Sequence, residues 1–84
     1  MTTHTFITDR GEYEVEAWCD GADVDLDTIW CRSDGVLRPS NRVSLYSDLA
    51  EYRDESIEAT QAYVEARILD RWYSDQENGL ANYL

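Results

Sequence analysis

The sequence contains no lysine, and its seven arginines are outnumbered by eighteen aspartates and glutamates. The resulting formal net charge of −11 exceeds the magnitude of roughly 2 to 8 that already keeps a small domain soluble. Nucleic acids and anionic membranes carry the same sign of charge, so neither is expected as a direct partner. A basic protein is the expected partner, because a negative field steers such a protein toward the chain.

Long apolar runs are also missing. No stretch approaches the roughly 18 residues that a membrane-spanning helix needs. The opening MTTHTFITDR lacks the basic start and the apolar centre of a signal peptide, so we expect a cytoplasmic protein. In that compartment Cys19 and Cys31 are expected as free thiols, although two cysteines also permit a disulfide.

Residues that carry chemistry are scarce. His4 is the single histidine, which leaves a hydrolytic triad without its base and a zinc site without enough ligands. Four aspartates have the spacing of a calcium loop, but Thr28 stands where that loop needs glycine. These aspartates are Asp23, Asp25, Asp27 and Asp34. We therefore predict no enzyme, no cofactor and no metal, with the four aspartates as a weak metal candidate.

Length and composition predict a single folded domain. A chain of 84 residues suffices for one core, and its ten aromatic residues distinguish it from a disordered acidic tail. Near the only proline, Pro39, the apolar period changes from about two residues to about 3.6. The pattern predicts an α+β fold: a three- to four-stranded antiparallel meander over residues 3–45, one long C-terminal helix over about 48–78 packed on one face, and a tail over 79–84.

The strands are predicted from alternation. Over residues 12–19, apolar residues alternate with glutamates, so one face packs and the other carries charge. Residues 23–32 alternate in the same way. Those expected to share a face are Val24, Leu26, Thr28 and Trp30. A fourth strand is expected over either 36–38 or 42–45.

The helix is expected to begin at Asp48, whose carboxylate caps the first turn while Glu51 completes a capping box. Gly79 is the expected end, because glycine adopts the left-handed conformation without steric cost. A break over 53–56, which would give two helices, stays open. The residues expected to face the sheet are Ala50, Ile57, Thr60, Val64, Ile68 and Trp72.

Carboxylates gather in three rows, which are the candidate binding residues. The members are Glu12, Glu14 and Glu16 on one strand, Asp23, Asp25 and Asp27 on the next, and Glu51, Asp54, Glu55 and Glu58 early in the helix. Same-face strand residues lie about 6.6 Å apart, whereas duplex DNA presents one charge per roughly 1.7 Å. No single row therefore imitates a duplex, and imitation requires the strand and helix rows on one surface.

Trp18 shares the outward face of the first glutamate row. An exposed tryptophan within an acidic rim has the composition of a binding hot spot, so Trp18 joins the candidate binding residues. The alternative is that the C-terminal tail or a shift in strand register covers it.

In size, charge and carboxylate rows, the chain resembles the small acidic inhibitor proteins that phages encode, among them DNA mimics and some anti-CRISPR proteins. The resemblance implies a non-catalytic inhibitor that occupies the basic groove of a nucleic-acid-binding protein in the host cytoplasm. Two alternatives stay open. One is an immunity or antitoxin-like protein that plugs the site of a basic enzyme, and the other is an acidic housekeeping domain of a salt-adapted organism.

Overall fold

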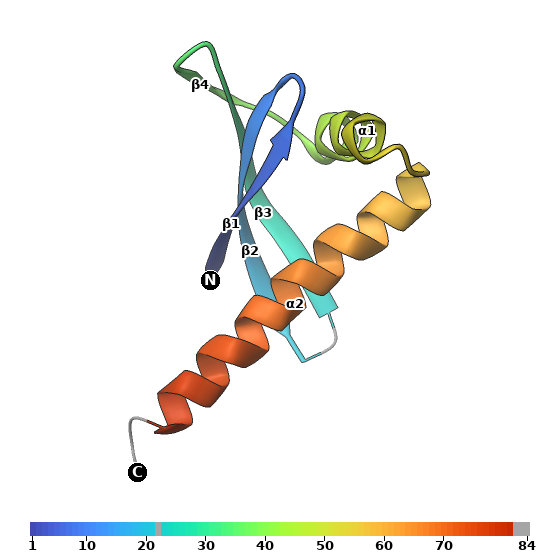
Figure 1. The fold of residues 1–84 in the computed structure, drawn as a ribbon. Helices are drawn as coiled ribbons and strands as arrows, with labels where there is room; N and C mark the ends of the chain where they lie inside the picture. Colours follow the sequence, from blue (N-terminus) through green and yellow to red (C-terminus); the bar gives the residue numbers. More distant parts are fainter. Residues whose placement is uncertain (22, 82–84) are drawn as a thin grey trace.

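The computed structural model describes residues 1–21 and 23–81, with side chains described as far as Asp75. Along the chain the elements are β1 (Thr2–Thr8), β2 (Gly11–Asp20), β3 (Asp23–Ser33), β4 (Val36–Pro39), α1 (Arg42–Arg53) and α2 (Ile57–Ala81). The strands form one antiparallel sheet in the order β1-β2-β3-β4 (Figure 1). The predicted α+β meander followed by a long C-terminal helix is confirmed.

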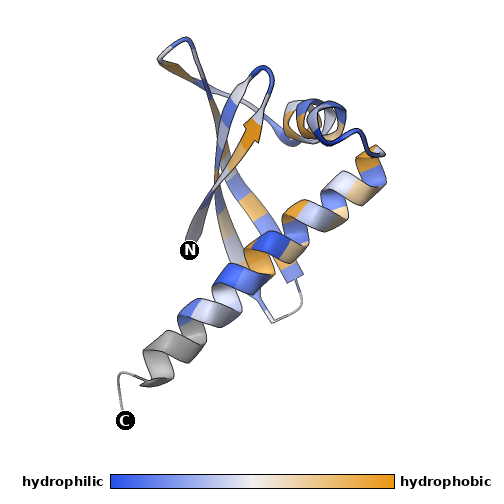
Figure 2. Cartoon of the chain, in the orientation of Figure 1, coloured by the Kyte–Doolittle hydropathy of each residue, from blue (hydrophilic) through white to orange (hydrophobic). Residues whose placement is uncertain are grey.

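Both helices pack on the same face of the sheet, and the core lies between them and the strands (Figure 1). Figure 2 shows apolar residues interleaved with hydrophilic ones along the elements, so that each element turns one side inward. Thr60, Val64 and Ile68 of α2 are fully buried, as the helical spacing predicted. Ile57 is 51% exposed, so its predicted place against the sheet is wrong.

A bulge in β3 changes which side chains reach the core. Asp27 has no partner in the register of β2 with β3, whereas Leu26 and Thr28 on either side of it both have one. The extra residue reverses the facing of the strand beyond it, so Ile29 is buried in place of Thr28. The prediction of one shared face is therefore wrong for Thr28 and Trp30.

The first helix begins earlier than predicted. Asn41 caps α1, because its Oδ1 accepts a hydrogen bond from the backbone N–H of Ser44 at 2.9 Å. Of the two options for the fourth strand, residues 36–39 form β4, and the option over 42–45 is wrong because these residues form the first turn of α1. Val43 and Leu45 have the two-residue spacing of a strand face, but in α1 they lie on opposite sides, with Leu45 fully buried and Val43 79% exposed.

Asp48, the predicted cap, has a different role inside α1. Its carboxylate accepts hydrogen bonds from the hydroxyl of Tyr13 and, at 3.1 Å, from Nη1 of Arg10. Tyr13 is 2% exposed, and burial together with this bond raises its hydroxyl pKa well above the ordinary value of 10. The contact fixes α1 to β2.

The helical region divides in two, and the break left open over 53–56 is confirmed. Asp54 adopts a left-handed conformation (φ 55°), and its backbone N–H donates to the carbonyl oxygens of Ala50 and Glu51 in the last turn of α1. Oγ of Ser56 then accepts from the N–H of Ala59 at 3.1 Å and starts α2. The predicted stop at Gly79 is wrong, because α2 continues to Ala81 and glycine permits an end without forcing one. Of the predicted tail, residues 82–84 lie outside the described residues.

Candidate functional site

Neither of the described helices covers the second face of the sheet, which we call the outer face (Figure 1). Side chains of β2 and β3 reach it in alternation with those of the core. Its seven carboxylates belong to Glu12, Glu14, Glu16, Asp20, Asp23, Asp25 and Asp27. Arg32 is the one arginine of these two strands, and its Nη2 lies 3.6 Å from Oε1 of Glu14. The two predicted strand rows therefore share one surface.

The register of β2 with β3 keeps most of these carboxylates apart. Glu16 lies opposite Thr28, and Asp25 lies opposite Trp18. Carboxylates thus alternate with uncharged side chains across the two strands, which limits the destabilisation that directly opposed like charges cause. The sheet can in this way carry a strongly acidic face without a ladder of repulsive pairs.

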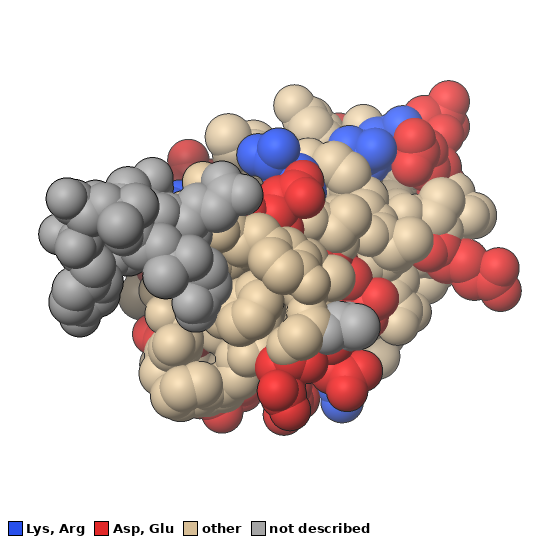
Figure 3. Space-filling view, turned by 90° about the horizontal axis from the view of Figure 1, so that it is seen from below, with Lys and Arg blue, Asp and Glu red and all other residues tan. Residues whose placement is uncertain are grey.

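The end of the sheet where β2 turns into β3 is the exception. Asp20 lies directly opposite Asp23 there. Figure 3, which views the molecule toward this end, shows acidic side chains gathered beside the hairpin. Asp20 was missed in the sequence analysis, although it continues the alternation of the glutamate row by one more outward position. Asp20, Asp23 and Asp25 thus lie close together at this end of the outer face, whereas Arg32 lies opposite Glu12 at the other end.

Trp18 stands within this acidic surface. It is 51% exposed and has Asp25 directly opposite, with Glu16 and Asp20 as its outer-face neighbours along β2. Its predicted exposure is confirmed, and the alternative of burial through a register shift is wrong. A contact with the tail would involve residues whose side chains lie outside the described part of the chain. Trp30 also reaches the outer face but is half-buried between Glu14 and Pro39.

The third predicted row lies on the helical side of the sheet. Glu51, Asp54, Glu55 and Glu58 come from the end of α1 and the start of α2. Glu51 is 3.2 Å from Nη2 of Arg10, and Glu55 is 3.4 Å from Nη2 of Arg53, so arginines already contact two of them. Because the sheet separates this row from the outer face, the three rows do not form the single surface that full imitation of a duplex requires.

The weak calcium candidate is separated by the fold. Asp23 is the first of the eleven residues of β3, and Asp34 directly follows the last of them. At about 3.3 Å per residue, the two carboxylates are more than roughly 30 Å apart along the strand. Within the described residues no group of three or more His, Cys, Asp or Glu side chains is arranged to hold a metal ion.

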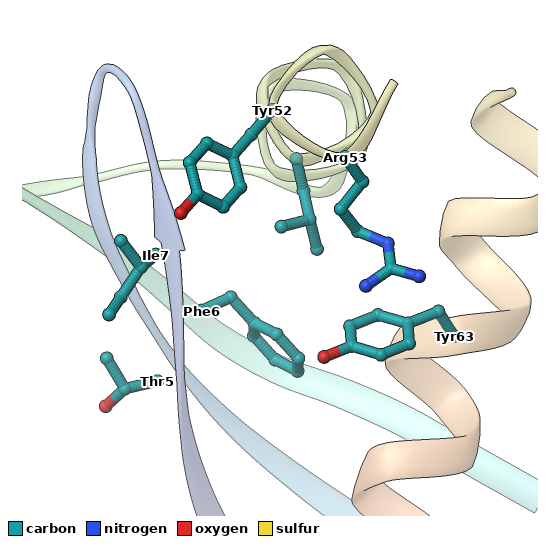
Figure 4. Close-up of a pocket in the computed structure, with 7 residues that line it drawn as sticks. Thr5, Phe6, Ile7, Tyr52, Arg53 and Tyr63 are labelled. Carbon is teal, nitrogen blue, oxygen red and sulfur yellow. The ribbon is translucent and has the colours of Figure 1, made fainter. Parts of the chain in front are cut away.

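A hollow opens beside the free edge of β1 (Figure 4). It has a volume of about 300 Å³ and is lined by Thr5, Phe6, Ile7, Leu49, Tyr52, Arg53 and Tyr63. The guanidinium of Arg53 lies 3.6 Å from the centre of the Tyr63 ring, and Phe6 meets that ring edge-on at 6.4 Å between centroids. None of the lining residues is Asp, Glu, His or Cys, and the polar side-chain groups belong to Thr5, Tyr52, Arg53 and Tyr63. Sequence reasoning missed it, because three separate segments build it.

Comparison with protein-family models, with curated proteins and with solved structures found no match to this chain. Among the described residues, neither helix combines the length and the apolar character that crossing a membrane requires. The outer face is therefore interpreted from its own geometry and charge.

Proposed function

We propose that this protein is a non-catalytic inhibitor of a basic, nucleic-acid-binding protein or complex, and that the outer face is its binding surface. The observation that carries the proposal is the set of seven carboxylates around the half-exposed Trp18, on a sheet face that the helices leave free. A basic surface complements this charge, and the complementarity speeds encounter and suppresses wrong partners.

The density of charge favours partial rather than complete imitation of a duplex. From Glu12 to Asp20, β2 spans about 26 Å at about 3.3 Å per residue, over which a duplex presents roughly 15 charges. The outer face holds seven carboxylates over this length, roughly half as many. It therefore offers a basic groove a weaker electrostatic match than DNA does, and binding requires further contacts.

Trp18 supplies such a contact. Its ring attracts an arginine or lysine of the partner with about 0.5 kcal/mol at an exposed site and about 2 kcal/mol once water is excluded. Asp25 opposite it and Glu16 beside it stabilise the same cation. This arrangement also favours the second candidate function, an immunity or antitoxin-like plug, in which a few residues around Trp18 dominate the affinity.

Alanine scanning of the outer face separates these two functions. After affinity capture of the partner from the native host, each outer-face residue is replaced and the dissociation constant is measured at several salt concentrations. Many small losses and a steep decline with salt indicate an inhibitor that acts through a distributed acidic field. One or two losses above about 2 kcal/mol centred on Trp18 indicate a plug. Affinity that neither salt nor any outer-face substitution changes refutes both.

A further inference from the structure

The helical side of the molecule contains a cavity in which basic groups predominate, unusual for a chain with a net charge of −11. It lies between β1 and α2, has a volume of about 240 Å³, and is lined by His4, Arg67, Asp70, Arg71 and Ser74. Two of the seven arginines and the only histidine thus meet at one place. We call it the anion cavity, for the reasons that follow.

The imidazole ring of His4 lines the cavity. It alternates with exposed Thr3 and Thr5 on β1, and its ring stacks on Phe6 at 6.3 Å between centroids with an interplanar angle of 21°. Its Nε2 atom is buried and has no hydrogen-bond partner. Less than 1 Å² of this atom is accessible, so a ligand in the cavity contacts other atoms of the ring.

The two arginines retain donors that a ligand can use. Among the side chains described through Asp75, Arg67 takes part in no ion pair, while Arg71 contacts Oδ1 of Asp75 through Nε at 3.5 Å. The terminal nitrogens of both guanidinium groups are the donors that recognise tetrahedral oxyanions. Asp70 also lines the cavity and weakens its positive field, which predicts modest affinity.

The field at His4 is nevertheless positive. Burial lowers the pKa of His4 below its ordinary value, Arg71 and Arg67 lower it further, and Asp75 opposes them with a smaller effect. The two arginines therefore oppose protonation of the imidazole more strongly than Asp75 favours it. An anion placed among these three groups would relieve that repulsion.

We propose that the anion cavity binds a small tetrahedral oxyanion, such as sulfate or phosphate, between Arg67 and Arg71 and beside the ring of His4. The arginines donate to its oxygens, and the ring of His4 responds to its charge. Ser74, one turn further along α2, offers its hydroxyl as an additional donor. This site lies on the helical side and is independent of the proposed role of the outer face.

Anion binding and protonation of His4 are thermodynamically linked, so each can be detected through the other. A bound dianion stabilises the imidazolium, so it raises the pKa of His4, and protonation of His4 must tighten anion binding by the same factor. An increase of about one pKa unit corresponds to about tenfold tighter binding to the protonated form. Asp70 and Asp75 are the carboxylates of α2 that face this site.

Because His4 is the only histidine, one set of imidazole signals reports on the site. We would follow them by NMR while titrating the intact protein with sulfate at constant ionic strength, and repeat the pH titration with and without sulfate. A saturable shift and a His4 pKa raised by about one unit are expected. Inorganic phosphate is expected to produce the same saturable shift at fixed pH.

Arg67→Gln is the decisive variant, because Arg67 is exposed and its replacement leaves the core intact, which an amide fingerprint verifies. It is expected to abolish the saturable shift. Arg38→Gln on β4 changes the net charge equally and is expected to leave the shift unchanged. A response that never saturates, or one that is equal in the two variants, overturns the proposal, since it reports general screening.

Discussion

Removal of the Asp48 carboxylate is expected to weaken the attachment of α1 to the sheet. Asp48→Ala deprives the hydroxyl of Tyr13 of its partner in a position that is 2% exposed. A buried hydroxyl without a partner costs about 1 to 3 kcal/mol. The lost contact with Arg10, whose side chain is 64% exposed, adds less than about 1 kcal/mol. We therefore expect the free energy of unfolding to fall by about 1 to 4 kcal/mol.

Urea denaturation of four proteins tests this expectation: wild type, Asp48→Ala, Tyr13→Phe and the double variant. Tyr13→Phe removes the donor and leaves Asp48 with Arg10, so it should cost less than Asp48→Ala. The double variant should cost less than the sum of the single ones, because the unpaired hydroxyl is gone. Arg10→Ala serves as the control for the ion pair alone. A loss below about 0.5 kcal/mol in Asp48→Ala, or strict additivity, would refute the reasoning.

Three further predictions concern the core, the alkaline limit and the acidic hairpin. Ile68→Ala, at a fully buried position, should lower the free energy of unfolding by about 2 to 5 kcal/mol in urea titrations, whereas Ile57→Ala, at a 51% exposed position, should cost far less. The raised pKa of Tyr13 means that the unfolded chain releases the hydroxyl proton near pH 10 while the folded chain retains it. The contribution of Tyr13 to the free energy of unfolding is therefore complete below pH 10 and is lost as the pH rises further. Tyr13→Phe should reduce this alkaline loss of stability, measured by circular dichroism. Asp23→Asn removes the like charge opposite Asp20 and should raise the melting temperature at low salt by the equivalent of about 0.2 to 1 kcal/mol, a gain that vanishes at high salt.

The local patterns predicted the kinds of element well but not all of their limits. The alternation in β2 is regular, and the structure buries Tyr13, Val15 and Ala17 as that alternation requires. In β3 the same reasoning failed beyond Leu26, because a bulge depends on how a strand pairs with its neighbour and leaves no mark on the alternation itself. The start of α1 was missed because Val43 and Leu45 have the two-residue spacing of a strand, whereas Leu45 shares a buried helix face with Leu49.

For the candidate site, too, local features could be predicted and long-range ones could not. The outward position of the glutamates of β2 and of Trp18 follows from alternation alone. That Asp25 lies opposite Trp18, and that the helix row lies behind the sheet, depends on strand register and helix docking, which are long-range properties. The anion cavity joins residue 4 to residues 67–74, and only the tertiary fold brings them together.

The most direct test of the binding surface compares two matched variants. One replaces Glu12, Glu14 and Glu16 by glutamine, and the other replaces Glu51, Glu55 and Glu58 by glutamine. Both remove three negative charges, but from opposite sides of the sheet. Each protein, verified as folded by its melting curve, is immobilised beside the wild type and used to capture partners from the native host.

We predict that one basic protein or complex binds to the wild type and to the helix-row variant, and is lost from the outer-face variant. Equal recovery on all three proteins, or loss from the helix-row variant alone, would contradict the assignment of the outer face as the binding surface.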